Sequence, residues 1–171
     1  MNTKKFSVAA LLALSMGVTA LMPAEASIAQ NAPRATAAVA IPDALKKSAI
    51  ATRSDKSGQI AGAQIGNSEY YVVYIKTQRG CGSGGCRAQI WKREGRTFTK
   101  RESLSVGSLP IVMIPQKSGM PQIGVTTYDG GKAQIIPHSF NGNGYNEGNY
   151  AARLPANTGR VLITTAMLKN F

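Results

Sequence analysis

From residue 59 onward, apolar and polar residues alternate in short runs, which is the pattern of half-buried β-strands. Such runs occupy residues 59–65, 69–76, 87–93, 97–106, 110–115, 122–128, 133–139 and 160–165. Turn residues separate them, and Asp129-Gly130-Gly131 is the clearest hairpin signal. The pattern predicts an all-β domain over residues 59–171, built as a β-meander, a sandwich or part of a propeller with blade-like units.

A weak internal repeat supports the propeller alternative. Ala88-Gln89-Ile90 recurs 45 residues later as Ala133-Gln134-Ile135, each time after an apolar strand and a glycine-rich turn. A period of this length matches one four-stranded blade, but two copies cannot close a propeller. The repeat is therefore either structural or a chance similarity.

Helical periodicity precedes the strands. Leu45, Ala49 and Ile50 share one face of a helix within residues 41–54, and Pro42 and Asp43 suit its first turn. Residues 27–39 are alanine-rich and have no hydrophobic period. We therefore expect residues 27–58 to form a flexible arm that carries one short N-terminal helix.

The first 26 residues have the three parts of a secretory signal peptide. Lys4 and Lys5 precede an apolar run at 6–22, and Ala-Glu-Ala at 24–26 matches the small-x-small cleavage pattern. We expect export to a bacterial periplasm or secretion, with cleavage directly after this pattern and no membrane span in the mature chain. The alternative is an uncleaved N-terminal anchor.

The chain is strongly basic, with 20 basic and 8 acidic residues and a net charge of +12. Signal removal takes away Lys4, Lys5 and Glu25, which leaves 18 basic and 7 acidic residues, a net charge of +11. Such a charge favours acidic partners of every kind, nucleic acid included. We expect an acidic protein or an anionic envelope component as partner, and we do not expect nucleic acid. The alternative is that the charge serves only solubility among polyanions.

Cys81 and Cys86 are the only cysteines, and they lie in the loop 79–87, RGCGSGGCR. In an oxidising compartment they are expected to form a disulfide that stabilises the chain by roughly 2 kcal/mol. The spacing is neither that of a redox pair nor that of a zinc site, so we expect no metal and no cofactor. The glycine N–H groups, with Arg79 and Arg87, can form an anion-binding nest, unless the hairpin is only structural.

Trp91 follows this loop in a run of alternating residues. Strand alternation puts it on one face with Arg87, Gln89 and Arg93. A tryptophan on a cationic face can stack on a sugar or a base. The alternative is that the N-terminal helix or a second sheet buries it.

The densest charge in the chain surrounds the turn Glu94-Gly95. Five cations lie within ten residues: Lys92, Arg93, Arg96, Lys100 and Arg101. A β-hairpin at this point would gather them at one end and present them to an acidic partner. The alternative is a hairpin tip whose charges are merely solvated.

His138 is the only histidine. A triad with Ser139 and Asp129 is conceivable, but no G-x-S-x-G motif supports it and no two carboxylates have a catalytic spacing. We therefore expect that the protein is not an enzyme. The predicted function is that of an exported binding or inhibitor/immunity-like protein that holds an acidic partner. The alternatives are a direct binder of lipopolysaccharide or acidic glycan, and a cryptic hydrolase around His138.

The run from Tyr70 through the CGSGGC loop to Val125, with LPI at 109–111 and QIGV at 122–125, resembles small exported proteobacterial proteins with a CGSGGC hairpin. The similarity covers about residues 60–165, and it implies export and a β-rich build. The strand before the cysteine loop is also similar to FG-GAP blade repeats, whose Asp/Asn-rich loop can bind calcium. Here the matching segment, 64–69, has no aspartate.

Overall fold

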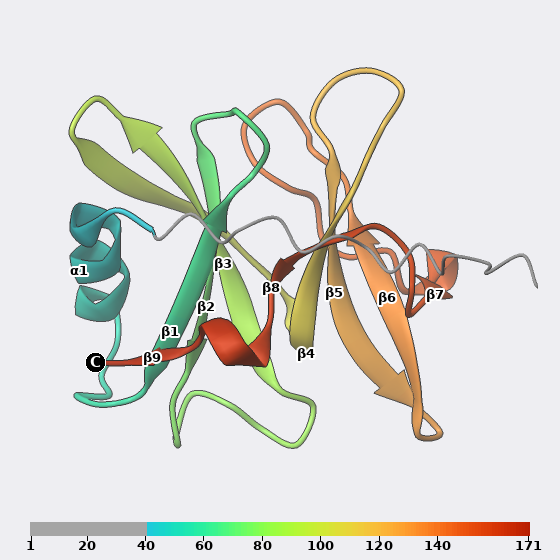
Figure 1. Cartoon of the computed structure of the whole chain (residues 1–171), viewed down its shortest axis with the longest axis horizontal. Helices are drawn as coiled ribbons and strands as arrows, with labels where there is room; N and C mark the ends of the chain where they lie inside the picture. The colour runs from blue at the N-terminus through green and yellow to red at the C-terminus, as the bar shows by residue number, and fades with distance from the viewer. Residues whose placement is uncertain (1–40) are drawn as a thin grey trace, which may run out of the picture. The chain divides into compact units, whose positions relative to one another are not determined.

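The computed structural model describes residues 41–171 (Figure 1). The predicted signal peptide and residues 27–40 of the predicted arm lie outside the described residues. The described part consists of α1 (Asp43–Ala51), β1 (Gln59–Gln64), β2 (Tyr70–Lys76), β3 (Cys86–Glu94), β4 (Thr97–Ile114), β5 (Gln122–Asp129), β6 (Lys132–His138), η1 (Tyr150–Ala152), β7 (Leu154–Pro155), β8 (Arg160–Ile163), η2 (Thr165–Met167) and β9 (Lys169–Asn170). The predicted all-β fold with one short helix is confirmed.

The strands form one antiparallel sheet in the order β7-β6-β5-β4-β3-β2-β1-β9, and β8 pairs with β4. From β1 to β6 each strand pairs with the next in the chain, which is the meander among the three predicted arrangements. The two copies of the Ala-Gln-Ile repeat lie on β3 and β6, in different settings. The first copy lies between two long strands, whereas the second lies between β5 and the two-residue β7. They are not equivalent blades.

β4 joins the two halves of the sheet. Up to Gly107 it pairs with β3, and from Ser108 onward it pairs with β5 and β8. The sequence predicts two strands here, but the Gly-Ser-Leu-Pro segment at 107–110 bends one continuous strand. A Cβ at Gly107 would lie 2.5 Å from the carbonyl oxygen of Thr126, so glycine lets β5 approach closely at the bend.

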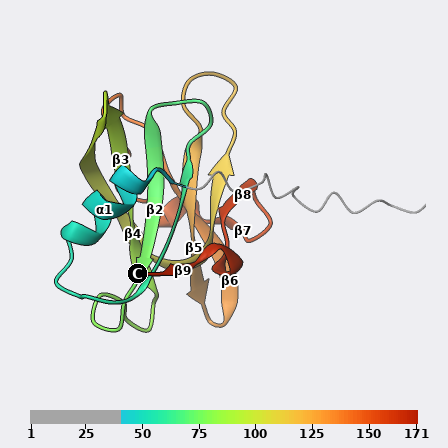
Figure 2. The ribbon, with the colours of Figure 1, turned by 60° about the vertical axis from the view of Figure 1, so that its left-hand side comes forward.

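Two hydrophobic clusters lie on the two faces of the first half of the sheet. The larger one joins both halves and includes Val72, Ile90, Ile111 and Ile123. The smaller one lies on the opposite face, where α1 covers the sheet (Figure 2). The bend of the sheet therefore encloses the larger cluster, and α1 covers the smaller one.

α1 is held to the sheet by the face that the sequence predicts. Leu45 and Ala49 are fully buried, and Ile50 is half-buried beside them. Asp43 lies in the first turn, where its carboxylate interacts favourably with the helix dipole. Near the end of the helix, Thr52 Oγ1 donates a hydrogen bond to the Ala49 carbonyl at 2.8 Å. No α-helix within residues 41–171 is long and apolar enough to cross a membrane.

Candidate binding surface at the β3–β4 hairpin

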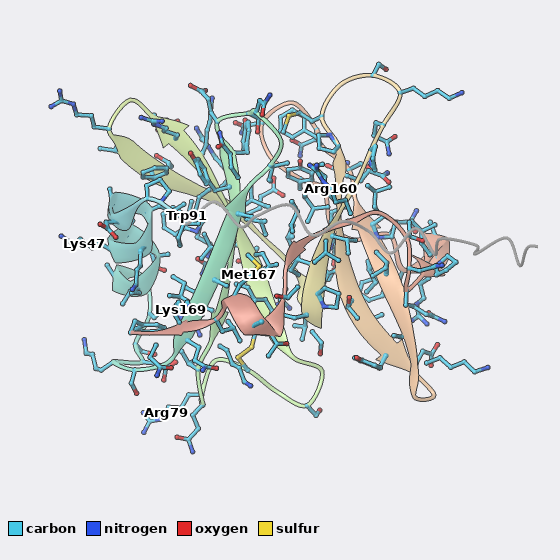
Figure 3. All side chains as sticks on the ribbon, in the orientation of Figure 1. Lys47, Arg79, Trp91, Arg160, Met167 and Lys169 are labelled. Carbon is cyan, nitrogen blue, oxygen red and sulfur yellow. A yellow bond between two sulfur atoms is a disulfide. The ribbon has the colours of Figure 1, made fainter. Side chains whose placement is uncertain are left out.

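The predicted binding residues do not form one surface. Arg87 and Arg93 lie near opposite ends of β3, six residues apart, which corresponds to about 20 Å along a strand. Arg79 extends from the disulfide loop at the lower end of the sheet, while the β3–β4 hairpin lies at the upper end (Figures 1 and 3). The cations thus divide into a small group at the disulfide loop and a larger group at the hairpin.

The middle of β3 does not reach the surface, which corrects the predicted binding role of Trp91 and Gln89. Trp91 is 2% exposed and Gln89 is 4% exposed, because α1 packs Leu45 and Ala49 over this face (Figure 3). The Trp91 indole N–H donates to Gln89 Oε1 at 3.0 Å, so both buried polar groups have a partner. The stacking platform is therefore wrong, and burial beneath the N-terminal helix is what occurs.

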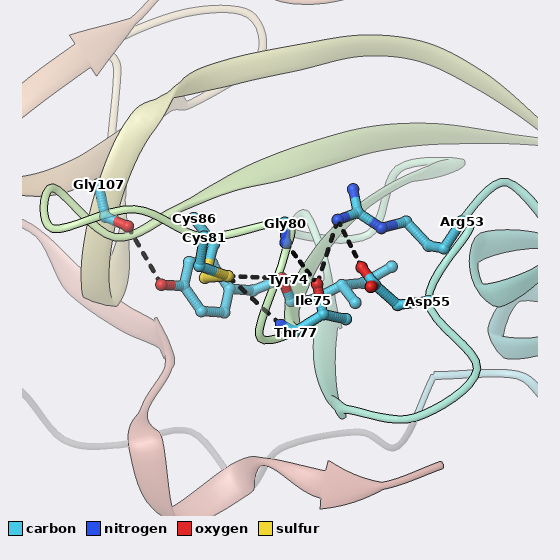
Figure 4. The surroundings of a disulfide bond; sticks show 9 residues. All are labelled: Arg53, Asp55, Tyr74, Ile75, Thr77, Gly80, Cys81, Cys86 and Gly107. Carbon is cyan, nitrogen blue, oxygen red and sulfur yellow. Dashed lines mark hydrogen bonds and ion pairs between the residues drawn. A yellow bond between two sulfur atoms is a disulfide. The ribbon is translucent and has the colours of Figure 1, made fainter.

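The predicted disulfide between Cys81 and Cys86 is confirmed, with the two Cα atoms 4.4 Å apart. Inside the ring, Gly82 and Gly85 exchange two backbone N–H···O hydrogen bonds of 3.0 Å. Next to it, the Gly80 N–H donates to Thr77 Oγ1 at 3.0 Å (Figure 4). Three of the four glycine N–H groups of the predicted anion nest are therefore occupied within the loop and are not free to bind an anion.

The disulfide loop instead joins neighbouring elements (Figure 4). The Tyr74 hydroxyl, on β2, donates to the Gly107 carbonyl on β4 at 3.1 Å. A Cβ at Gly85 would lie 2.0 Å from that same carbonyl oxygen, so the loop packs directly against the bend of β4. Arg79 and Arg87 remain exposed at the edge of this structural joint.

The predicted hairpin is present at the other end. Glu94 pairs with Thr97, and Gly95 adopts φ +64° in the turn, a conformation that favours glycine. The Glu94 carboxylate accepts a hydrogen bond from Thr99 Oγ1 at 2.7 Å and forms an ion pair with Arg101. The Thr99 hydrogen bond, followed by the charge of Arg101, holds the pKa of the Glu94 carboxyl below its usual value. Arg101 is therefore occupied by the hairpin itself.

Four hairpin cations have no ion pair within the described part of the chain: Lys92, Arg93, Arg96 and Lys100. Lys92 lies opposite Thr99, and its ammonium sits 5.8 Å from the centre of the Tyr70 ring, within reach of a cation–π contact. The strand alternation places Arg93 and Lys100 on the other face, and Arg96 lies in the turn. The hairpin thus presents positive charge on both faces and at its tip.

A pocket of about 410 Å³ lies beside this hairpin. The β1–β2 turn forms one wall, held by a hydrogen bond of 2.7 Å from Gln64 Nε2 to the Ser68 carbonyl. The hairpin forms the other wall, joined to the turn by the Arg93 N–H, which donates to the Glu69 carbonyl at 2.8 Å. The full lining is Gln64, Asn67, Ser68, Glu69, Tyr71, Arg93 and Gly95. In the sequence, 64–69 is distinguished only by its similarity to a calcium-binding loop. Its proximity to the hairpin arises from the pairing of β2 with β3.

The hypothetical triad around His138 is not assembled, so that arrangement is wrong. His138 is fully buried, and its Nδ1 lies 3.0 Å from the Asn146 carbonyl oxygen. Ser139 is exposed and accepts a hydrogen bond from Gln122 Nε2 at 2.9 Å. Asp129 forms an ion pair with Arg153 at the far end of β5. Burial lowers the pKa of the His138 imidazole below its usual value, against the opposing effect of its bond to Asn146.

The structure places a different serine near this histidine. A Cβ at Gly148 would lie 2.6 Å from Ser105 Oγ and 2.9 Å from His138 Cε1, so both side chains flank the same glycine. Within the described residues neither Ser105 Oγ nor His138 Nε2 has a hydrogen-bond partner. Ser105 is only 6% exposed and His138 is fully enclosed, so a substrate has no direct access to either group. Within residues 41–171, no three His, Cys, Asp or Glu side chains gather into a group that could hold a metal ion.

Comparison of the chain with protein-family models, curated proteins and solved structures gives no match. A function therefore has to be argued from the site alone.

Proposed function

We propose that the chain is a non-catalytic, exported binding protein of the inhibitor or immunity type, which holds an acidic protein through the tip of the β3–β4 hairpin. The observation that carries the proposal is the group of four cations without ion pairs, Lys92, Arg93, Arg96 and Lys100, on one short hairpin. Their like charges repel one another, so a surface rich in carboxylates would relieve this repulsion on binding.

The hairpin is suited to recognition because its shape is fixed before binding. The strand ladder continues to Glu94 and Thr97, and the Thr99 and Arg101 contacts to Glu94 stabilise the strands next to the turn. A preformed surface loses little conformational entropy on association. Exposed cations also attract an acidic partner over a distance and raise the association rate.

Two further observations support the export and the absence of catalysis in this proposal. A disulfide such as Cys81–Cys86 is typical of proteins outside the reducing cytoplasm, which agrees with a periplasmic or secreted location. The enclosed His138 offers no accessible base to a substrate. The hairpin, by contrast, presents its charges in the open.

Retention of a partner from a periplasmic extract tests this proposal. Wild-type protein is expected to retain one acidic protein at low salt, and the double variant Arg96→Gln/Lys100→Gln is expected to retain at least about tenfold less. The matched control is Arg79→Gln/Arg87→Gln, which removes the same charge at the disulfide loop and should retain the partner normally. An equal loss in both double variants would rule out the hairpin as the contact surface.

Direct binding of an envelope polyanion, such as lipopolysaccharide or an acidic glycan, is the second candidate function. Residues 41–171 contain 17 basic and 7 acidic residues, a net charge of +10, with only three ion pairs. Cations this widely spread suit a polymer that follows the whole surface. In that case both double variants above should lose affinity to the same degree, and lipid or glycan rather than protein would be retained.

A further inference from the structure

We propose that the pocket between the β1–β2 turn and the β3–β4 hairpin receives one acidic side chain of the protein partner, with its carboxylate on Arg93 and an adjacent peptide N–H facing Glu69. The inference rests on the proposed function and deepens it, because it identifies which chemical group of the partner is anchored. Arginine in a pocket at the centre of an interface is a common source of binding energy. The cations around it would then form the outer part of the interface.

Arg93 is held in a suitable position for this contact. Its main-chain N–H donates to the Glu69 carbonyl at 2.8 Å, and its side-chain Nε donates to the Gly95 carbonyl at 3.1 Å. The second bond fixes the plane of the guanidinium and leaves its two terminal nitrogens without an ion pair in the described part of the chain. Two parallel N–H groups of this kind match the two oxygens of a carboxylate.

Glu69 determines what must lie beside that carboxylate. It precedes β2, directly across from Arg93, and the two side chains line the same pocket without forming an ion pair. Residues that face each other across two strands have Cβ atoms about 5 Å apart. A second carboxylate near Glu69 would be repelled, whereas a peptide N–H one or two bonds from the bound side chain would be accepted.

The lining favours a peptide over a sugar. Tyr71 is 5% exposed, and its ring packs edge-on against Phe98 with centroids 5.5 Å apart, so the pocket has no open aromatic face on which a sugar ring can stack. Asn67 instead adds an amide group that can bond a peptide backbone. The Ser68 hydroxyl stabilises the turn, because it donates to the Ile65 carbonyl at 2.7 Å and accepts from the Tyr70 N–H at 3.2 Å. A volume of about 410 Å³ accommodates one side chain with its flanking peptide groups.

A titration followed by amide NMR signals of the full mature chain tests the pocket without the partner. The probe is N-acetyl-glutamate N-methylamide, and its glutamine analogue is the uncharged control. The glutamate probe is expected to shift the amide signals of Asn67, Glu69, Arg93 and Gly95, with a dissociation constant in the millimolar range. The glutamine analogue should bind at least about tenfold more weakly. Absence of localised shifts with the glutamate probe would overturn the inference.

Two variants and a third probe complete the design. Arg93→Lys keeps the charge but loses the two-pronged geometry, so it should weaken the glutamate probe at least about fivefold. Arg79→Lys, at the exposed disulfide loop, is the matched control outside the pocket and should bind normally. Glucuronate tests the alternative ligand class, and tighter binding of glucuronate than of the glutamate probe would overturn the assignment to a peptide.

Partner retention separates failure of this inference from failure of the proposed function. If wild-type protein retains an acidic protein and Arg93→Lys retains it as well as Arg79→Lys does, the pocket is not the anchor although the binding function stands. If wild-type protein retains no acidic protein, the proposed function fails, and the probe titration still decides whether the pocket binds a carboxylate.

Discussion

His138 lies at the end of β6, beneath the loop that returns to Asn149, and its ring is fully enclosed. Its Nδ1–H donates a hydrogen bond to the Asn146 carbonyl oxygen at 3.0 Å, which leaves Nε2 as the unprotonated nitrogen of the neutral ring. A second proton on Nε2 would place a positive charge in this enclosed environment, where the ring flanks Gly148 together with Ile136 and Ser105. Glu147 is the charged group that opposes this cost, but burial outweighs it, and the pKa of His138 is lowered.

The lowered pKa of His138 predicts a specific dependence of stability on pH. In the unfolded chain the histidine pKa is near its ordinary value of 6.5, while in the folded chain it is below that value. The full stability is therefore present above about pH 6.5, and it falls by up to about 1.4 kcal/mol per pH unit as the pH decreases from there toward the folded pKa. The free energy of unfolding in urea, measured between pH 7.5 and 5, checks this prediction.

His138→Gln provides the matched control, because an amide can still donate to the Asn146 carbonyl but does not titrate. In this variant the decrease between pH 6.5 and 5 should be smaller than in wild type. Equal slopes in the two proteins would mean that the carboxylates, and not His138, cause the dependence. An NMR titration of the His138 ring with a pKa above 6.5 would also contradict the prediction.

At the scale of elements, the strands of four or more residues were predictable from the sequence, and the two-residue strands were not. β1, β2, β3, β5, β6 and β8 lie where the sequence pattern predicts them. β7 and β9 have two residues each and exist only through their pairing with β6 and β1, so no local pattern identifies them. The sequence predicts a break at the bend of β4, because glycine and proline occur both in turns between strands and at bends within one strand.

The candidate site was likewise predictable only where its residues are close in sequence. The hairpin cations were predictable because they are close in sequence, and the Glu94-Gly95 turn indicates where the chain reverses. The pocket was not, because its walls are the 64–69 turn and Arg93, which meet only through the register of β2 against β3. Trp91 was ambiguous for a related reason: alternation gives the face of a residue, but not whether a helix covers that face.

The Cys81–Cys86 disulfide closes a small ring at the start of β3, whereas the β3–β4 hairpin turn follows the end of that strand. We therefore predict that Cys81→Ser/Cys86→Ser lowers the free energy of unfolding by about 2 kcal/mol and leaves the fold intact. Urea denaturation measures the loss, and the near-ultraviolet circular dichroism of the enclosed Trp91 reports whether the packing beneath α1 persists. Partner retention should not change. Loss of the Trp91 signal in buffer would show that the whole sheet depends on this bond.

At the scale of the molecule, positive charge is distributed over both ends of the sheet and is scarcely neutralised within it. Among residues 41–171 the ion pairs are Arg53–Asp55, Arg101–Glu94 and Arg153–Asp129. The first two pairs join residues close in sequence, and the third joins the end of β5 to the segment after η1. The remaining cations contribute mutual repulsion to the folded state and attraction to an acidic partner, so one property affects stability and binding in opposite directions.

Salt should therefore change stability and binding in opposite senses. Raising sodium chloride from about 50 to 300 mM shortens the Debye length from about 14 to 6 Å and screens the repulsion between exposed cations. We predict that the melting temperature rises by about 3 °C while the affinity for the acidic partner falls about tenfold. The Arg96→Gln/Lys100→Gln variant relieves part of the repulsion at the hairpin, so its melting temperature should start higher and rise less with salt.

A melting temperature that falls with salt would mean that attractive pairs outweigh the repulsion in the folded state. Affinity that does not change with salt would mean that apolar contacts, rather than the hairpin cations, hold the partner.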